Sequence, residues 1–193
     1  MFGTVAVILA MALPQAAAGV EDKVKSDVSA EVAQSGLGGM WYEGFVAPDG
    51  TIEACNARVA VGDAAAATKV CDHLVGLQAT PARDPKGRKA YGYFFGSFSF
   101  SPTVPQMPVG VLPSDLTIAA KGLPGGKSAR IGVAVNVGSD GKVTACEAGG
   151  ESPLGKVACQ QATGMDLPVG KSKKGKAVAY LRPLIVDFQP DPG

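Results

Sequence analysis

The feature that most constrains this chain is an internal duplication. The segment from Met40 to Cys55 aligns without a gap with the segment from Ile131 to Cys146. After a three-residue deletion in the second copy, Cys71 aligns with Cys159. Ordered matches at a fixed spacing are typical of a repeated supersecondary unit. The sequence therefore predicts two copies of one small unit.

Each copy begins with the pattern of a β-hairpin. Apolar residues alternate from Ile131 to Val137, which is the period of a half-buried strand. Asp140-Gly141 then supplies a two-residue turn, because glycine tolerates the positive φ that type I′ turns require. Asp49-Gly50 has the same place in the first copy. The returning strand ends at Cys55 or at Cys146.

The rest of the unit is predicted as a helix followed by a strand. Asp63 before a run of alanines predicts a helix over residues 63–74, and Ser152-Pro153 predicts another over 152–162. The last strands are expected over 91–100 and 177–188, and a further helix precedes each hairpin, over 26–34 and 114–120. The predicted fold class is α+β: two tandem αββαβ domains, each with a small three-stranded antiparallel sheet and a packed helix. They cover residues 26–100 and 114–188, and the Pro-rich residues 101–113 form a stiff linker.

Residues 1–19 carry no charge and read as a cleaved secretory signal peptide. An apolar run over residues 5–13 is ended by Pro14, and small residues follow up to Gly19. The usual basic residue before the run is missing. Two alternatives stay open, a buried N-terminal helix and a retained membrane anchor, although the run is short for a span. The expected location is the periplasm, with membrane contact only if this segment is retained.

The four cysteines fit an oxidising compartment, where an even number favours disulfides. Three connectivities are possible, and the repeat favours pairing within each copy, Cys55 with Cys71 and Cys146 with Cys159. Each bond would join the second strand to the following helix. Loops of this length predict about 3 kcal/mol of stabilisation per bond in the chain-entropy description.

Composition and motifs exclude several classes of function. Lys+Arg (18) and Asp+Glu (17) nearly cancel, which argues against nucleic-acid binding. His73 follows Cys71 by two residues, a spacing at which helical side chains do not face each other. The stretch from Gly122 to Ser128 is one residue too short for a phosphate-binding loop. We expect no enzyme activity, no metal site and no cofactor.

Two further features are open to more than one interpretation. The basic residues 171–176 are typical of a solvated hairpin tip, and the alternative is contact with anionic lipid or peptidoglycan carboxylates. Trp41 and Tyr42 are typical of a strand's core residues, and the alternative is surface recognition.

These motifs together resemble the C-terminal domain of TonB-type energy transducers. That family shows a strand, an Asp-Gly turn, a Val-Thr-x-Cys strand end, a small-residue helix with a second cysteine, and a Pro-Ala-x₄-Gly-Lys/Arg stretch before the last strand. Residues 80–88 match the last stretch in the first copy. The second copy keeps residues 140–146 and 175–178 but lacks the Pro-Ala pair. The resemblance covers nearly all of residues 26–100 and 114–188.

The resemblance implies a binding module in which the edge of the sheet accepts an extended peptide strand. The implied partner is an outer-membrane receptor peptide or another envelope protein. The implied receiving residues lie on the two final strands: Tyr91, Tyr93, Phe95, Val178, Tyr180 and Leu184. Only about a dozen residues separate the apolar run from the first copy, too few for the spacer of a working transducer, so a soluble periplasmic relative is expected. The alternatives are a structural two-domain envelope protein without a dedicated ligand and, third, a redox protein that uses one cysteine pair.

Overall fold

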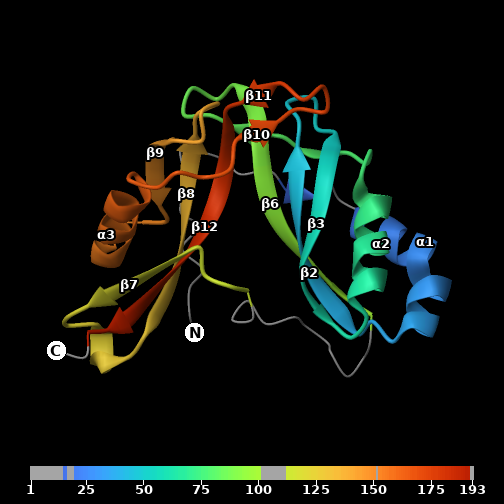
Figure 1. Ribbon diagram of the computed structural model, residues 1–193, viewed down its shortest axis with the longest axis horizontal. Helices are drawn as coiled ribbons and strands as arrows, with labels where there is room; N and C mark the ends of the chain where they lie inside the picture. Colours follow the sequence, from blue (N-terminus) through green and yellow to red (C-terminus); the bar gives the residue numbers. More distant parts are fainter. Residues whose placement is uncertain (1–14, 17–19, 101–111, 151, 192–193) are drawn as a thin grey trace.

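The computed structural model describes residues 15–16, 20–100, 112–150 and 152–191. Within them the chain is a mixed α+β protein with one large, open, eight-stranded sheet and three α-helices (Figure 1). The backbone of the sheet has the strand order β3-β2-β6-β12-β8-β9, with β5 on β6 and β7 on β12. Nearly all of the predicted signal peptide and linker lies outside the described residues.

The first half contains the predicted hairpin, helix and strand. Gly50 has a φ of 93° in the turn, and the Asp49 carboxylate accepts the Thr51 N–H at 2.9 Å. Asp63 caps the helix by accepting the Ala65 N–H at 2.8 Å. The elements are β2 (Gly39–Val46), β3 (Ile52–Val61), α2 (Ala64–Leu74), β4 (Ala79–Thr80), β5 (Ala82–Arg83) and β6 (Lys89–Ser99).

The first helix, α1, runs from Val20 to Ser35 and so contains the expected 26–34 segment. Val24, Val28 and Val32 recur every four residues, and all three are buried in one core with α2. This spacing places them on one face of the helix. Before α1, the short β1 (Gln15–Ala16) pairs with β4.

The second half begins with a strand, and the predicted helix over 114–120 is wrong. Leu116–Ala120 forms β7, which pairs in parallel with the end of β12. Local sequence favours neither state strongly here, and pairing with a distant strand decides the outcome. The elements are β7, β8 (Ala129–Val137), β9 (Val143–Ala148), α3 (Pro153–Ala162), β10 (Gly170–Lys171), β11 (Ala177–Val178) and β12 (Tyr180–Pro190). The order αββαβ is therefore absent from the second half.

The two halves are joined through their last strands. In each half three strands pair antiparallel, β3-β2-β6 and β12-β8-β9, as predicted. The prediction did not include the parallel pairing of β6 with β12, which aligns Tyr91 with Tyr180 and Gly92 with Leu181. This short pairing is called the join below. Beyond this contact the two strands diverge (Figure 1).

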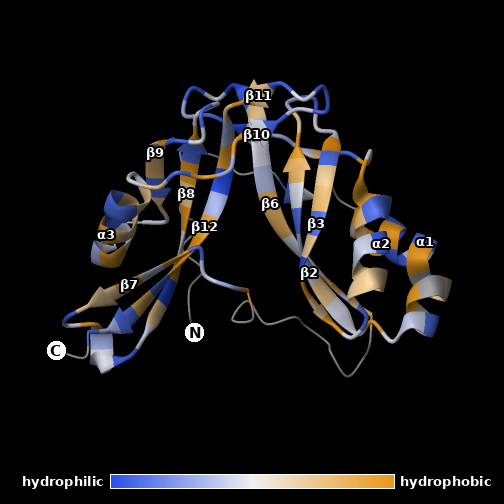
Figure 2. Ribbon diagram, viewed as in Figure 1, coloured by the Kyte–Doolittle hydropathy of each residue, from blue (hydrophilic) through white to orange (hydrophobic). Residues whose placement is uncertain are grey.

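Helices cover opposite faces of the joined sheet. Phe94 and Phe98 of β6 lie in the core under α1 and α2. The neighbouring Tyr91 and Tyr93 point the other way and pack with the core that contains Ala158 and Ala162 of α3. Figure 2 shows apolar residues in the strands on both sides of the contact between β6 and β12.

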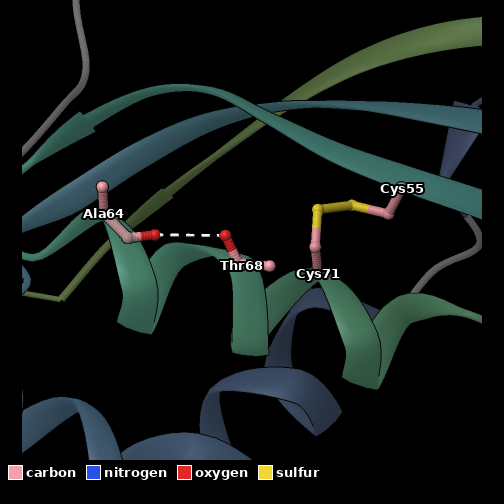
Figure 3. The surroundings of a disulfide bond; sticks show 4 residues. All are labelled: Cys55, Ala64, Thr68 and Cys71. Carbon is pink, nitrogen blue, oxygen red and sulfur yellow. Dashed lines mark hydrogen bonds between the residues drawn. A yellow bond between two sulfur atoms is a disulfide. The ribbon is translucent and has the colours of Figure 1, made fainter.

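In each half, one disulfide links a strand of the sheet to the helix that follows it. Cys55 of β3 is bonded to Cys71 of α2, and Cys146 of β9 to Cys159 of α3, which is the connectivity expected from the repeat. Figure 3 shows the first bond, beside the Thr68 hydroxyl that donates to the Ala64 carbonyl one turn earlier at 3.2 Å. The described residues contain no free cysteine.

Candidate functional site

The outward edge of β6 is open beyond its short contact with β12. The Phe100 N–H donates to the Gly38 carbonyl at 2.9 Å, so alternate residues from Phe100 backwards bond to β2. The intervening residues, Phe95, Ser97 and Ser99, direct their N–H and C=O groups away from β2. Among the described residues no strand pairs with this side of β6 after Gly92.

The corresponding edge of β12 is closed. Beyond the pairing with β6, Pro183 has no N–H to offer. The next outward residue is Ile185, whose N–H donates to the Asp115 carboxylate and whose carbonyl accepts the Asp115 N–H, both at 2.8 Å. From Val186 onwards β7 occupies the edge. Within the described residues, β6 is therefore the one final strand that presents a run of unpaired backbone groups.

The sequence-derived receiving residues are divided between this edge and the join. Tyr91, Tyr93 and Tyr180 come together around Phe45 of β2, with ring centroids 5.4, 4.6 and 6.1 Å from that of Phe45. Leu184 is buried in the same core. Val178 lies in β11, paired with Gly170. Phe95, half-buried, lies on the open part of β6.

A buried ion cluster lies where the two strands diverge. The Arg182 guanidinium of β12 reaches Glu43 of β2 at 3.1 Å and Asp115 at 3.3 Å, and Arg58 approaches Glu43 at 3.5 Å. Glu43 and Arg182 are only 5% and 8% exposed. Arg182 also lies over the Tyr93 ring, 5.5 Å from its centroid.

This cluster and the aromatic rings make the contact between β6 and β12 a buried junction with both charged and aromatic side chains. Burial raises the pKa of Tyr93 and raises the pKa of Tyr180 to about 12. The Tyr180 hydroxyl donates to the Pro168 carbonyl at 2.7 Å. Sequence reasoning missed Phe45, Glu43 and Arg182. The sequence did contain a signal for Glu43, because it is a carboxylate within the otherwise apolar strand β2.

Trp41 lies beside the open edge. Its register partner on β6 is Ser97, and the Trp41 side chain is half-buried. The indole N–H is buried and has no hydrogen-bond partner in the structure. Buried donors are normally paired, so the Trp41 indole leaves an unmet hydrogen-bond donor next to the open edge. Tyr42, in contrast, is a fully buried core residue.

The other sequence candidates do not assemble into a chemical site. His73 is exposed in the last turn of α2, and Cys71 beside it is disulfide-bonded. The 122–128 segment contains a short 3₁₀ helix (Pro124–Gly126) within the connection that leads into β8. The described residues contain no group of three or more metal-ligating side chains, and none of their helices is long and apolar enough to cross a membrane. Comparison with family models, curated proteins and solved structures finds no match to this chain.

Proposed function

We propose that this protein is a periplasmic binding protein that accepts an extended peptide segment as an added strand on β6. The observation that carries the proposal is the unpaired run from Phe95 to Ser99. A strand edge of this kind is a template for pairing with another chain, and main-chain hydrogen bonds supply the affinity.

The contrast between the two edges supports a binding role for β6. Sheet edges that are not used are normally blunted by charges, prolines or covering loops. The β12 edge has a proline at Pro183 and is covered by Asp115 and β7. The β6 edge between Phe95 and Ser99 contains neither charge nor proline. In the part of the chain that the structure describes, one edge is thus protected and the equivalent one is open.

The side chains around this edge favour a peptide with apolar residues at alternate positions. Phe95 and Trp41 flank it on one face, and the half-buried Phe100 extends the aromatic core on the other. Successive side chains of an added strand point to opposite faces. One set would then contact Phe95 and the exposed part of the Trp41 ring.

The compartment and the evolutionary origin belong to the same proposal. Two disulfides favour an oxidising compartment, for which the periplasm is our proposal. The order strand-strand-helix-strand is common to both halves, as β2-β3-α2-β6 and β8-β9-α3-β12. We propose that they are two copies of one TonB C-terminal-like domain, of which the first keeps its leading helix.

The test is peptide selection against the full chain, followed by a backbone substitution in the edge. A phage-displayed library of nine-residue peptides is selected, and the most enriched sequence is synthesised and labelled. Ser97→Pro removes one outward N–H and leaves the β2 side of the ladder intact, because proline is tolerated on edge strands. Ser97→Ala is the matched control that keeps the N–H.

We expect Ser97→Pro to weaken peptide binding at least tenfold and Ser97→Ala to change it less than threefold. Absence of any enriched peptide, or equal binding to both variants, contradicts the proposal. Sedimentation of the free chain provides a second check. A dimer that Ser97→Pro converts to a monomer would mean that a second copy occupies the edge, and would also overturn the proposal.

The structural alternative has an observation of its own in the buried Glu43–Arg182 pair. It ties the halves together irrespective of any ligand. If no peptide binds, a structural role for the two joined halves is the remaining proposal.

A further inference from the structure

A second concave surface lies between the two halves, at the end of the sheet where β6 and β12 pair. It is a groove of about 740 Å³. One wall comes from the β2–β3 hairpin and the other from the β10–β11 hairpin, while the first residues of β6 form the floor. The two hairpins meet at this end of the molecule in Figure 1.

The groove is lined by four lysines and one carboxylate. Lys89 comes from β6, and Lys173, Lys174 and Lys176 come from the β10–β11 hairpin; all four are exposed. Among the described residues no carboxylate forms an ion pair with any of them. Figure 2 shows hydrophilic loops gathered around this end of the sheet.

The single carboxylate, Glu53, is already engaged. It accepts the backbone N–H of Lys173 at 2.9 Å and so ties the second-half hairpin to β3 of the first half. This contact holds the lysine-bearing hairpin over the groove without neutralising its side chains. The positive charge of the lining is therefore left for a ligand.

The floor is largely apolar. Tyr91 stacks on Phe45 with ring centroids 5.4 Å apart, and Val178 and Pro48 line the groove near it. The volume lies within the range of about 300–1,000 Å³ that is usual for ligand pockets. A ligand that fits this lining has separated anionic groups on a neutral or apolar body.

We propose that this groove binds a short acidic peptide, whose carboxylates pair with the lysines while its backbone and apolar groups lie on Tyr91. Lys89 and the three hairpin lysines stand on different elements, which suits at least two separated carboxylates. Because the apolar floor lies between two walls, a flat bilayer surface cannot reach it, and a peptide can. The site is separate from the open edge of β6.

The experiment measures fluorescence anisotropy of a labelled Ala-Glu-Ala-Glu-Ala-Glu peptide with the full chain at low salt. The isosteric Ala-Gln-Ala-Gln-Ala-Gln peptide is the ligand control. Lys89→Gln combined with Lys176→Gln removes one charge from the floor and one from the β10–β11 wall. Lys127→Gln combined with Lys156→Gln makes the same change of net charge at two exposed lysines outside the groove.

We expect the glutamine peptide to bind at least tenfold more weakly than the glutamate peptide. The groove variant should lose about four- to 25-fold in affinity, since each of the two exposed ion pairs typically accounts for about two- to fivefold. The control variant should change less than twofold, and the affinity of the parent chain should fall as salt rises. Ser97→Pro should retain this binding, which separates the groove from the β6 edge.

Three results would overturn this inference. One is undetectable binding of the glutamate peptide. Another is equal loss in the groove and control variants, which would mean that only net charge matters. The third is binding of phosphatidylglycerol vesicles, lost in the groove variant, without binding of the peptide. That result would assign the lysines to a membrane surface.

Discussion

Arg182→Met should destabilise the protein by about 3 kcal/mol, because it leaves the Glu43 carboxylate buried beside a weaker partner. The side chains of Arg182 and Glu43 are 10% and 6% exposed, and they approach to 3.1 Å. Removal of one partner of a buried pair usually costs about 3–5 kcal/mol. Arg58 remains at 3.5 Å from Glu43, so we expect the lower end of that range.

The assay is thermal unfolding followed by circular dichroism, with urea unfolding as a second measure. For a chain of this size each kcal/mol shifts Tm by about 2–4 °C, so we expect a decrease of about 6–12 °C. Arg130→Met is the control: it breaks a bidentate pair with Asp187, but the two side chains are 30% and 23% exposed. Its cost should be about 1 kcal/mol or less.

A double-variant cycle separates the ion pair from lost packing. Glu43→Gln removes the charge that Arg182→Met leaves with Arg58 as its weaker partner, so the double variant should be less destabilised than the sum of the single ones. If Arg182→Met lowers Tm no more than Arg130→Met does, the buried junction does not hold the two halves together, and the reasoning is wrong.

Three further predictions concern the second disulfide, the close packing at Gly96 and the pH dependence of stability. Replacing Cys146 and Cys159 by alanine should lower the free energy of unfolding by about 3 kcal/mol, and an unchanged urea midpoint would contradict this. Gly96→Ala should cost about 1–3 kcal/mol in the same assay, because its Cβ would overlap the Tyr42 ring, whereas Gly132→Ala, with open space around it, should be nearly neutral. Hydrogen bonding to Arg130 lowers the pKa of Asp187 below its usual value of 3.8. The ion pair therefore stabilises the fold above about pH 4, and this contribution is lost as the pH falls through the lowered pKa. Stability measured between pH 5 and 2 should fall less steeply in Arg130→Met than in the parent chain, and equal slopes would refute this assignment.

Local patterns predicted most of the strands and helices. The Asp-Gly turns and the Asp63 cap act within a few residues of their own position, so the hairpin of each half and helix α2 could be located from sequence. The cysteine pairing followed from the repeat. These features depend on short-range chemistry that the sequence displays directly.

Features that depend on distant partners could not be predicted in the same way. Leu116–Ala120 becomes a strand because β12 lies beside it, and Asp115 fixes it there by accepting the Ile185 N–H. The join of β6 and β12 is only two residue pairs long and leaves no periodic signal. For the same reason the resemblance could name two receiving strands but could not show that one of them would be closed.

The most direct test of strand addition on β6 is amide hydrogen exchange along this strand, with and without the selected peptide. In the free chain the N–H groups of Phe94 and Phe98 bond to β2 and should exchange slowly, while those of Phe95, Ser97 and Ser99 should exchange fast. A saturating peptide should slow the second set by at least tenfold and leave the first set unchanged. Protection of Phe95, Ser97 and Ser99 in the free chain, or fast exchange of all three in the presence of peptide, would contradict strand addition at this edge.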